Sequence, residues 1–215
     1  MQLDEYYLTR AELNIFQTQS QQLLDLFDSG GAFRIVELGA GDGMKTKFLL
    51  KYFQDKGADF SYCPVDISAN VLEELRKNML EEMPTLNMEP LAGDYFQVLS
   101  DLKFQNHKRN IAFFLGSNIG NFRRDLAIDF LSSIQRNLKT GDFLLIGFDL
   151  KKDPKRILSA YNDSKGVTKA FNLNLLNRIN RELGGNFQMD AFDHNPIYDP
   201  MTGECRSYLI AKSPQ

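Results

Sequence analysis

The sequence predicts an α/β fold in which helices cover both faces of a parallel sheet. Apolar runs of strand length alternate along the chain with segments of helical periodicity, the pattern of repeated strand–helix units. A turn with glycines at positions 39, 41 and 43 follows the first strand, at the end of the sheet where such folds bind ligands. The 215 residues, 43% of them hydrophobic, can bury a full core without a metal or a disulfide. We therefore expect a single domain over residues 1–215.

The expected elements follow one another in a regular order. Residues 1–30 form an N-terminal helical segment, because Leu13, Phe16, Leu24 and Phe27 share a helical face that ends at a pair of glycines. Strands are predicted at 33–38, 60–66, 87–91, 111–116 and 143–149, and helices at 45–54, 71–82 and 125–139. A polar, helix-rich insertion then covers 151–200 before a last strand at 207–211.

Composition narrows the class of protein. A net charge of -3 and an isoelectric point near 5.5 provide no broad basic surface, so we expect small-molecule chemistry and no nucleic acid. Cys63 and Cys205 form neither a Cys-x-x-Cys pair nor a zinc spacing, and no metal is expected. The N-terminus does not resemble a signal peptide, and no apolar run approaches the roughly 20 residues that cross a bilayer. These features predict a cytoplasmic protein without membrane contact and leave its oligomeric state open.

The run from Glu37 to Gly43 predicts a cofactor loop, and its spacing separates three ligands. A dinucleotide fingerprint needs its third glycine at position 44, where this chain has Met44, so NAD is disfavoured. A phosphate loop needs a glycine directly before Lys45-Thr46, and Met44 intervenes again, which leaves this alternative weaker. The remaining pattern, Glu-x-Gly-x-Gly-x-Gly, resembles the first motif of class I methyltransferases, whose fold has a Rossmann-like sheet and which bind S-adenosylmethionine. The methionine carboxylate of that cofactor would suit a helix N-terminus and Lys45. An ordinary glycine-rich turn is the structural alternative.

Polar residues at the next strand ends are candidate ligands for the same cofactor. Asp66 ends the second strand 23 residues after Gly43, where a carboxylate can accept hydrogen bonds from both ribose hydroxyls, or can cap the next helix. Asp94 follows the third strand and could accept a hydrogen bond from an adenine amino group, with the aromatic ring of Tyr95 near the base. A Gly-Asp pair is also common in turns.

The fourth strand ends in an unusual run of small and amide residues, Gly-Ser-Asn-Ile-Gly-Asn at positions 116–121. The amides of Asn118 and Asn121 can donate and accept hydrogen bonds beside the expected methyl donor. Such an uncharged polar site suits a zwitterionic or amine substrate. The alternative is a turn that uses Asn and Gly for backbone reasons.

Together these segments resemble the histidine-specific methyltransferase family, whose best-known member makes hercynine in ergothioneine biosynthesis. The resemblance covers nearly the whole chain in the same order. It includes residues 5–10 (Glu-Tyr-Tyr-Leu-Thr-Arg), 36–41 with Lys45-Thr46, 64–66 (Pro-Val-Asp), 93–95 (Gly-Asp-Tyr), 114–121 (Phe-Leu-Gly-Ser-Asn-Ile-Gly-Asn), 149–154 (Asp-Leu-Lys-Lys-Asp-Pro), 160–163 (Ala-Tyr-Asn-Asp), 166–168 (Gly-Val-Thr), 170–172 (Ala-Phe-Asn) and 180–184 (Asn-Arg-Glu-Leu-Gly).

The resemblance implies roles for individual residues. The residues that it implies for binding S-adenosylmethionine are Gly39, Gly41, Lys45, Asp66, Asp94 and Tyr95. It also implies that Tyr6 lies between cofactor and substrate, and that Asn121 and Tyr161 hold the α-amino and carboxylate groups of an amino acid. Thr168 and Phe171 would line the same pocket. Without the resemblance, Tyr161 and Phe171 would be interpreted as core aromatic residues.

The chain also departs from the family pattern. Leu8 and Asn118 replace a proline and a threonine of the family, and Cys205-Arg206-Ser207 replaces an Ile-Glu-Met segment. Family members usually carry a segment before the Tyr-Tyr motif and another after the last strand. The second segment includes the Glu and Ser that hold the histidine imidazole in the family. This chain carries neither, so we expect a nearly complete cofactor half and a partial acceptor half.

The sequence therefore predicts an S-adenosylmethionine-dependent methyltransferase that N-methylates a histidine-like amino acid or a small amine. Two alternatives stay open. One is an S-adenosylmethionine-binding protein without turnover, and the other is a nucleotide-binding protein that uses Lys45 and Thr46.

Overall fold

A computed structural model of the chain describes residues 3–28, 30–101 and 108–213, which form two compact units. The sheet unit comprises Leu8–Asp149. The hairpin unit combines Met1–Tyr7 with Leu150–Gln215, so it is built from two stretches of chain that flank the sheet unit in sequence. Among the described residues, no helix is both long and apolar enough to span a membrane.

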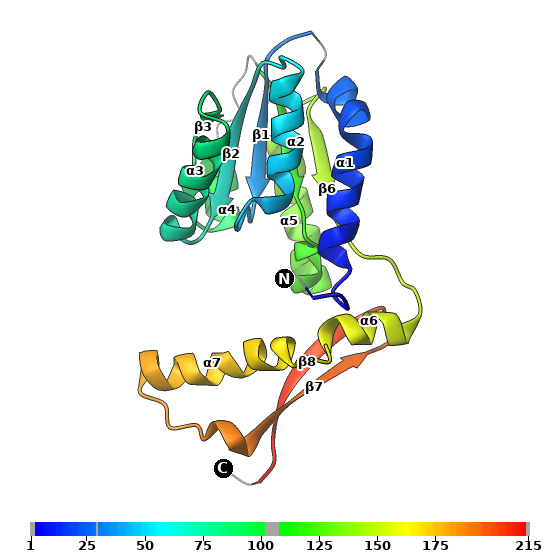
Figure 1. Ribbon diagram of the computed structural model, residues 1–215, viewed down its shortest axis with the longest axis vertical. Helices are drawn as coiled ribbons and strands as arrows, with labels where there is room; N and C mark the ends of the chain where they lie inside the picture. The colour runs from blue at the N-terminus through cyan, green and yellow to red at the C-terminus, as the bar shows by residue number, and fades with distance from the viewer. Residues whose placement is uncertain (1–2, 29, 102–107, 214–215) are drawn as a thin grey trace. The chain divides into compact units, whose positions relative to one another are not determined.

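The sheet unit contains a parallel sheet whose strand order reverses at its first strand (Figure 1). Its strands are β1 (Phe33–Leu38), β2 (Phe60–Asp66), β3 (Asn87–Met88), β4 (Leu91–Ala92), β5 (Arg109–Phe114) and β6 (Phe143–Ile146). They are arranged β3-β2-β1-β5-β6, with β4 also paired to β2, and all pairs are parallel. Because β1 lies between β2 and β5, the loop after β1 stands at the switch point, where α/β sheets bind their ligands.

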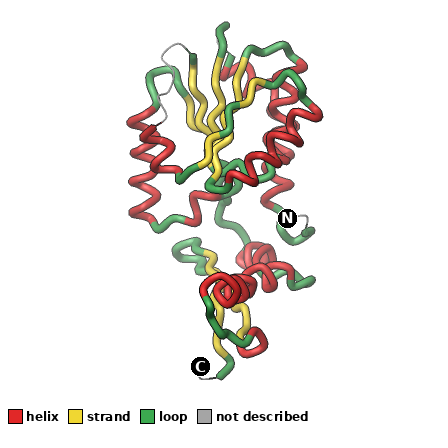
Figure 2. The backbone as a smooth tube through the Cα atoms, turned by 90° about the vertical axis from the view of Figure 1, so that its left-hand side faces the viewer, coloured by secondary structure: helices red, strands yellow, loops and turns green. Residues whose placement is uncertain are grey.

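Helices cover both faces of this sheet, as Figure 2 shows. The helices of this unit are α1 (Leu8–Phe27), α2 (Met44–Asp55), α3 (Ala69–Glu82), α4 (Tyr95–Asp101) and α5 (Arg124–Asn137), with a short 3-10 turn, η1 (Asn118–Asn121). The first three bury their apolar stripes in one cluster, and α4 and α5 bury theirs in another. Alternate strand residues divide between the clusters: Phe33 and Ile35 face the first, and Val36 faces the second.

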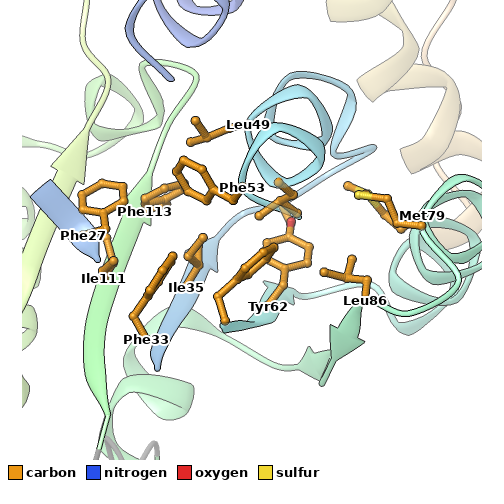
Figure 3. Packing of buried hydrophobic residues seen from close by; sticks show 14 of the residues in the cluster. Phe27, Phe33, Ile35, Leu49, Phe53, Tyr62, Met79, Leu86, Ile111 and Phe113 are labelled. Carbon is orange, nitrogen blue, oxygen red and sulfur yellow. The ribbon is translucent and has the colours of Figure 1, made fainter. Parts of the chain in front are cut away.

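The larger cluster is rich in aromatic rings (Figure 3). Phe33 stacks on Phe60 with centroids 5.6 Å apart, and Phe27 meets Phe53 edge to face at 6.2 Å. Each fully buried ring of this size removes about 150–250 Å² from water. The contacts join α1 and α2 to the middle of the sheet and so fix the starting point of the loop between β1 and α2.

The hairpin unit has helices α6 (Pro154–Tyr161) and α7 (Val167–Leu183), the 3-10 turn η2 (Met189–Ala191), and strands β7 (Phe192–Tyr198) and β8 (Cys205–Ala211). The strands pair antiparallel, from Phe192 opposite Ala211 to Tyr198 opposite Cys205. Helix α6 begins in a favourable way, since Asp153 accepts a hydrogen bond from the Lys155 N–H at 2.9 Å and Pro154 occupies the first turn.

Residues 3–7 belong to the hairpin unit and are held there by side chains. Glu5 accepts hydrogen bonds from the backbone and hydroxyl of Ser164. The ring of Tyr7 lies under two cations, Lys152 at 4.8 Å and Arg156 at 4.7 Å, and its hydroxyl accepts a hydrogen bond from Lys152. This short stretch is thus part of the unit formed by the last third of the chain.

The structure confirms the predicted α/β class and corrects several elements. The strands at 33–38 and 60–66 have the predicted bounds, whereas the strand predicted at 87–91 is two short pieces, and the strands predicted at 111–116 and 143–149 end at Phe114 and Ile146. The predicted insertion at 151–200 contains two helices but also β7, and the last strand pairs with β7 in a separate sheet. The short helix α4 was not predicted.

Candidate cofactor and acceptor residues

The loop between β1 and α2 turns on three glycines with positive φ: Gly39 at 77°, Gly41 at 54° and Gly43 at 62°. The Gly39 N–H donates to the carbonyl of Val65 at 2.8 Å, which ties the loop to the end of β2. A Cβ atom on Gly41 would meet no atom within 4 Å. The backbone at Gly41 is therefore bare and open, which is the condition for a bulky ligand to approach it closely.

The third glycine of the motif has a packing role. Gly43 precedes the first turn of α2, and a Cβ atom there would overlap Leu75 and lie 2.6 Å from the Met79 Cε atom, both on α3. The glycine lets the start of α2 pack directly against α3. Two features therefore favour glycine at position 43, one residue before the third glycine of a dinucleotide fingerprint. They are the close packing of α2 on α3 and the positive φ of the turn.

Glu37, the acidic residue of the motif, is directed into the core. Its carboxyl group accepts hydrogen bonds from the hydroxyls of Thr46 at 2.7 Å and Tyr62 at 2.5 Å. Burial raises the pKa of Glu37 to about 7, although these two hydrogen bonds act in the opposite direction. The Glu37 side chain links β1, β2 and α2, and it supports the glycine loop from the core side.

Asp66 contacts the glycine loop from the end of β2. Its Oδ2 atom accepts a hydrogen bond from the Gly41 N–H at 3.2 Å, and its Oδ1 atom accepts one from the Ser68 N–H at 3.0 Å. Ser68 is the residue that caps α3, because its hydroxyl accepts a hydrogen bond from the Val71 N–H at 3.3 Å. The helix-capping alternative for Asp66 is therefore unnecessary, and its half-buried carboxylate lies beside the loop.

Tyr95 closes one side of the loop. The Gly93 N–H donates to the carbonyl of Asp66 at 3.0 Å, which places the start of α4 beside β2. The ring of Tyr95 packs edge to face on Phe114, and its hydroxyl lies where a Cβ atom on Gly39 would project. Burial raises the pKa of Tyr95, helped by the nearby carboxylates, so the group stays a neutral hydroxyl.

Asp94 behaves as a turn residue in this structure. It is exposed, and its Oδ1 atom accepts a hydrogen bond from the Phe96 N–H at 2.9 Å. This local contact accounts for the Gly-Asp pair in terms of turn chemistry. Its predicted hydrogen bond to an adenine amino group stays a prediction.

Lys45 already has an anionic partner. It lies in the first turn of α2 and forms an ion pair with Glu12 of α1, and Glu12 also accepts a hydrogen bond from the Gly116 N–H at 2.7 Å. The side-chain nitrogen of Asn118 also lies near the loop, 3.2 Å from where a Cβ atom on Gly39 would stand. One donor of the Lys45 ammonium is therefore engaged by a carboxylate of the same unit, and any anionic ligand at this place would share the cation with Glu12.

The turn after β5 is strained. Gly116 and Ser117 both have positive φ, 71° and 59°, and Ser117 is the one non-glycine residue of the described ranges with this property. The Ser117 hydroxyl accepts a hydrogen bond from the Asp149 N–H at 3.2 Å. A non-glycine residue held in this region costs of the order of 1 kcal/mol or more and is common at functional sites. Asn121, four residues after Ser117, is exposed at the end of η1.

The remaining predicted acceptor residues lie in the hairpin unit. The rings of Tyr6 and Tyr161 meet edge to face with centroids 6.0 Å apart. The Thr168 N–H donates to Asp163 at 2.7 Å in the first turn of α7, and Phe171, one turn further on, is 70% exposed. The interpretation of Phe171 as a core aromatic residue is therefore wrong.

The sheet order, the open glycine loop and the acidic side chain at the end of the next strand define a Rossmann-like cofactor-binding unit. A model of the family described as "Histidine-specific methyltransferase, SAM-dependent" matches residues 1–215. The chain belongs to this family.

Relatives in three organisms are similar over most of the chain. The histidine N-alpha-methyltransferases of Mycolicibacterium smegmatis and Mycobacterium tuberculosis are 37% and 36% identical to it, over 99% and 89% of its length. Ergothioneine biosynthesis protein 1 of Schizosaccharomyces pombe is 32% identical over 98%. The chain spans 65%, 58% and 28% of the lengths of these three relatives.

The residues of the glycine loop fit the cofactor named by this family. The bare backbone at Gly41 leaves room for a nucleoside, and the carboxylate of Asp66 adjoins it. The cation of Lys45 lies at the other end of the same loop, where a cofactor carboxylate would need one. Neither Glu12 nor the internal role of Glu37 was found from the sequence, because nothing in the local pattern marks which way a glutamate side chain points.

Proposed function

We propose that this protein is an S-adenosylmethionine-dependent N-methyltransferase whose acceptor is the α-amino group of histidine, a histidine-like amino acid or a small amine. The observation that carries the proposal is the match of the family model over residues 1–215. The glycine loop and its neighbours supply an independent physical argument, since their geometry suits an adenosyl cofactor with an amino-acid end.

We assign the cofactor to the sheet unit. The backbone of Gly39 and Gly41 would lie against the adenosyl group, Asp66 would accept hydrogen bonds from the ribose hydroxyls, and Lys45 would bind the methionine carboxylate. Asp94 would accept a hydrogen bond from the adenine amino group, and Tyr95 would contact the base. When bound, the cofactor supplies a methyl group that its sulfonium has already made electrophilic.

The acceptor chemistry asks little of the protein beyond orientation. An α-amino group titrates near 8, so its proton is lost at small cost at neutral pH and no strong base is needed. We assign Asn121 and Tyr161 to the amino and carboxylate groups of the acceptor, with Tyr6 beside the reacting nitrogen. Support for this assignment comes from the edge-to-face contact of Tyr6 with Tyr161 and from the exposure of Asn121. The family resemblance also assigns Thr168 and Phe171 to binding of the acceptor.

Mass spectrometry tests the acceptor directly. The protein is incubated with S-adenosylmethionine and each of the twenty amino acids in turn, and a methylated histidine is the expected product. Calorimetric binding of the cofactor without any methylated product would instead favour a binding protein without turnover. A competition between ATP and S-adenosylhomocysteine separates the nucleotide-binding alternative, and we expect ATP not to compete.

A single substitution tests the assignment of the acceptor residues. Asn121→Ala should abolish methyl transfer while leaving the affinity for S-adenosylhomocysteine within a few-fold, because the side chain is assigned to the acceptor only. Asn174→Ala, at an exposed position of α7, is the matched control and should keep both properties. Equal losses of transfer and of cofactor affinity in the Asn121 variant would contradict the assignment.

Other properties of the whole protein stay predictions from the sequence. These are the cytoplasmic localisation, the absence of nucleic-acid and membrane partners, and the organisation of residues 1–215 as one methyltransferase domain.

A further inference from the structure

Glu12 is a partly buried carboxylate of the sheet unit with an unusual set of neighbours. Its side chain is only 16% exposed, although it lies in the second turn of a surface helix, α1. The ion pair with Lys45 engages one oxygen, and the hydrogen bond from the Gly116 N–H engages the other. One side chain of α1 thus contacts both the first turn of α2 and the turn that follows β5.

The chain leaves space for this carboxylate at a third point. A Cβ atom on Gly147, just after β6, would overlap the Glu12 Oε1 atom. The Gly147 N–H donates instead to the carbonyl of Phe114 at 2.9 Å, so the backbone at this point is fixed. The glycine at position 147 therefore allows Glu12 to reach the ends of β5 and β6.

The contacts of Glu12 limit the freedom of Lys45. A lysine ammonium on a four-carbon stem has many rotamers and three donors. Here the Lys45 Nζ atom is held 3.4 Å from the Cβ position at Gly116, and its side chain is 22% exposed. One donor is directed to Glu12, which leaves the others for a second acceptor. The ion pair therefore fixes the cation at one end of the glycine loop.

We propose that Glu12 is a positioning residue for the amino-acid end of the cofactor. It fixes the Lys45 ammonium and the Gly116 turn so that both face the methionine part of S-adenosylmethionine. The adenosyl part, which adjoins Gly41 and Asp66, does not depend on it. This inference rests on the proposed function, in which Lys45 binds the cofactor carboxylate.

Two ligands separate this role from a general structural one. S-adenosylhomocysteine has the amino-acid end, whereas 5′-methylthioadenosine keeps the adenosyl group and the sulfur but has a methyl group in place of the amino-acid end. The carboxylate of Glu12 accepts hydrogen bonds from two donors, the Lys45 ammonium and the Gly116 N–H. In Glu12→Gln, one of these donors faces an amide N–H, which cannot accept. We expect calorimetry to show an affinity for S-adenosylhomocysteine about tenfold lower, as for the loss of a charge-assisted hydrogen bond, with the affinity for 5′-methylthioadenosine within twofold.

Three further variants sharpen the test. Gly147→Ala leaves Glu12 chemically intact but displaces its carboxylate, so it should cause the same selective loss and serves if Glu12→Gln fails to fold. Asp66→Asn should weaken both ligands, because both contain the ribose. Glu74→Gln, at an exposed glutamate of α3, removes a charge elsewhere and should change neither affinity.

Each other outcome overturns the proposal in a recognisable way. Equal losses for both ligands would give Glu12 a structural role only. Tighter binding of S-adenosylhomocysteine to Glu12→Gln would show that the carboxylate competes with the ligand for Lys45. Failure of the wild-type protein to bind either ligand would overturn the proposed function, and the role of Glu12 with it.

Discussion

Glu37 illustrates how a residue of a ligand-binding motif can act from inside the core. Its carboxyl group is buried beneath the glycine loop and receives hydrogen bonds from Thr46 and Tyr62. Burial favours the protonated acid, and the pKa of Glu37 is accordingly raised to about 7. The group that supports the loop therefore changes its charge near neutral pH.

The raised pKa of Glu37 predicts a pH-dependent stability. Between the ordinary carboxyl pKa and about 7 the folded state keeps a proton that the unfolded state has lost, so this contribution to the free energy of unfolding falls as the pH rises. Glu37→Gln cannot titrate. Relative to the wild type, it should gain roughly 3 kcal/mol between pH 4.5 and pH 8, as for a shift of between two and three pKa units. Urea unfolding followed by circular dichroism measures the difference. Parallel stability curves for the two proteins would contradict the assignment.

The sequence alone predicts which residues gather at the glycine loop better than it predicts the residues that hold them in place. Gly39, Lys45, Asp66 and Tyr95 converge on one loop in the structure, and each was marked by its place at a strand end or a helix start. Glu12 could not be found in this way. It is 33 residues before Lys45 and looks like any solvated charge of an amphipathic helix, because its burial arises only when α1 packs along the sheet and brings Glu12 to the ends of β5 and β6.

At the scale of elements, continuous apolar runs were predicted well and mixed ones were not. The buried parallel strands β1 and β2 are mostly apolar, although β1 contains Arg34 and Glu37, and this composition makes their bounds visible. Strand β7 contains Asp193, Asn195 and Pro196 and is partly exposed in a two-stranded sheet, so its composition resembles that of a loop. Strand β7 forms by pairing with β8, and the local sequence of β7 carries no information about that partner.

The start of α7 depends on one acidic residue. Asp163 is buried and accepts hydrogen bonds from the N–H groups of Val167 at 2.8 Å and Thr168 at 2.7 Å. Burial by itself would raise the pKa of Asp163, but hydrogen bonds from the Thr168 side chain and from the N–H groups of Thr168 and Val167 lower it below its ordinary value. The contribution is therefore present at neutral pH and is lost as the pH falls through the lowered pKa.

Asp163→Ala should destabilise the hairpin unit by about 1–2 kcal/mol at neutral pH, because two N–H groups of the first turn lose their acceptor. Hydrogen exchange should quicken at the amides of α7 and remain unchanged in the sheet unit. Asp163→Asn keeps an acceptor oxygen, so its stability and its exchange rates in α7 should lie between those of the wild type and Asp163→Ala. A uniform change of exchange in both units would show that the cap stabilises more than its own helix.

The whole molecule has an unusual chain path, since the sheet unit is inserted between two segments of the hairpin unit. Contacts within the hairpin unit therefore span large sequence separations, 145 residues from Tyr7 to Lys152 and 159 residues from Glu5 to Ser164. Contacts within the sheet unit bring its two ends together, because Gly147 adjoins Glu12. Once the sheet unit has formed, the chain between the two segments of the hairpin unit is effectively shorter. The entropic cost of bringing these two segments together is then lower by on the order of 2 kcal/mol.

This order predicts the result of a refolding experiment. Pulse-labelling hydrogen exchange should show protection of the amides of β1, β2 and β5 before those of β7 and β8. Tyr7→Leu, which removes the hydroxyl and the ring beneath two cations, should speed unfolding of the hairpin unit and leave the protection of the sheet unit unchanged. Simultaneous protection of all strands would contradict a stepwise order.

The edge-to-face contact of Tyr6 with Tyr161 also has a consequence during synthesis on the ribosome. The two tyrosines emerge many seconds apart at the usual rate of about 5–20 residues per second, and the whole of the sheet unit is translated in the interval. A nascent chain can thus complete the sheet unit before Tyr161 is available to pair with Tyr6.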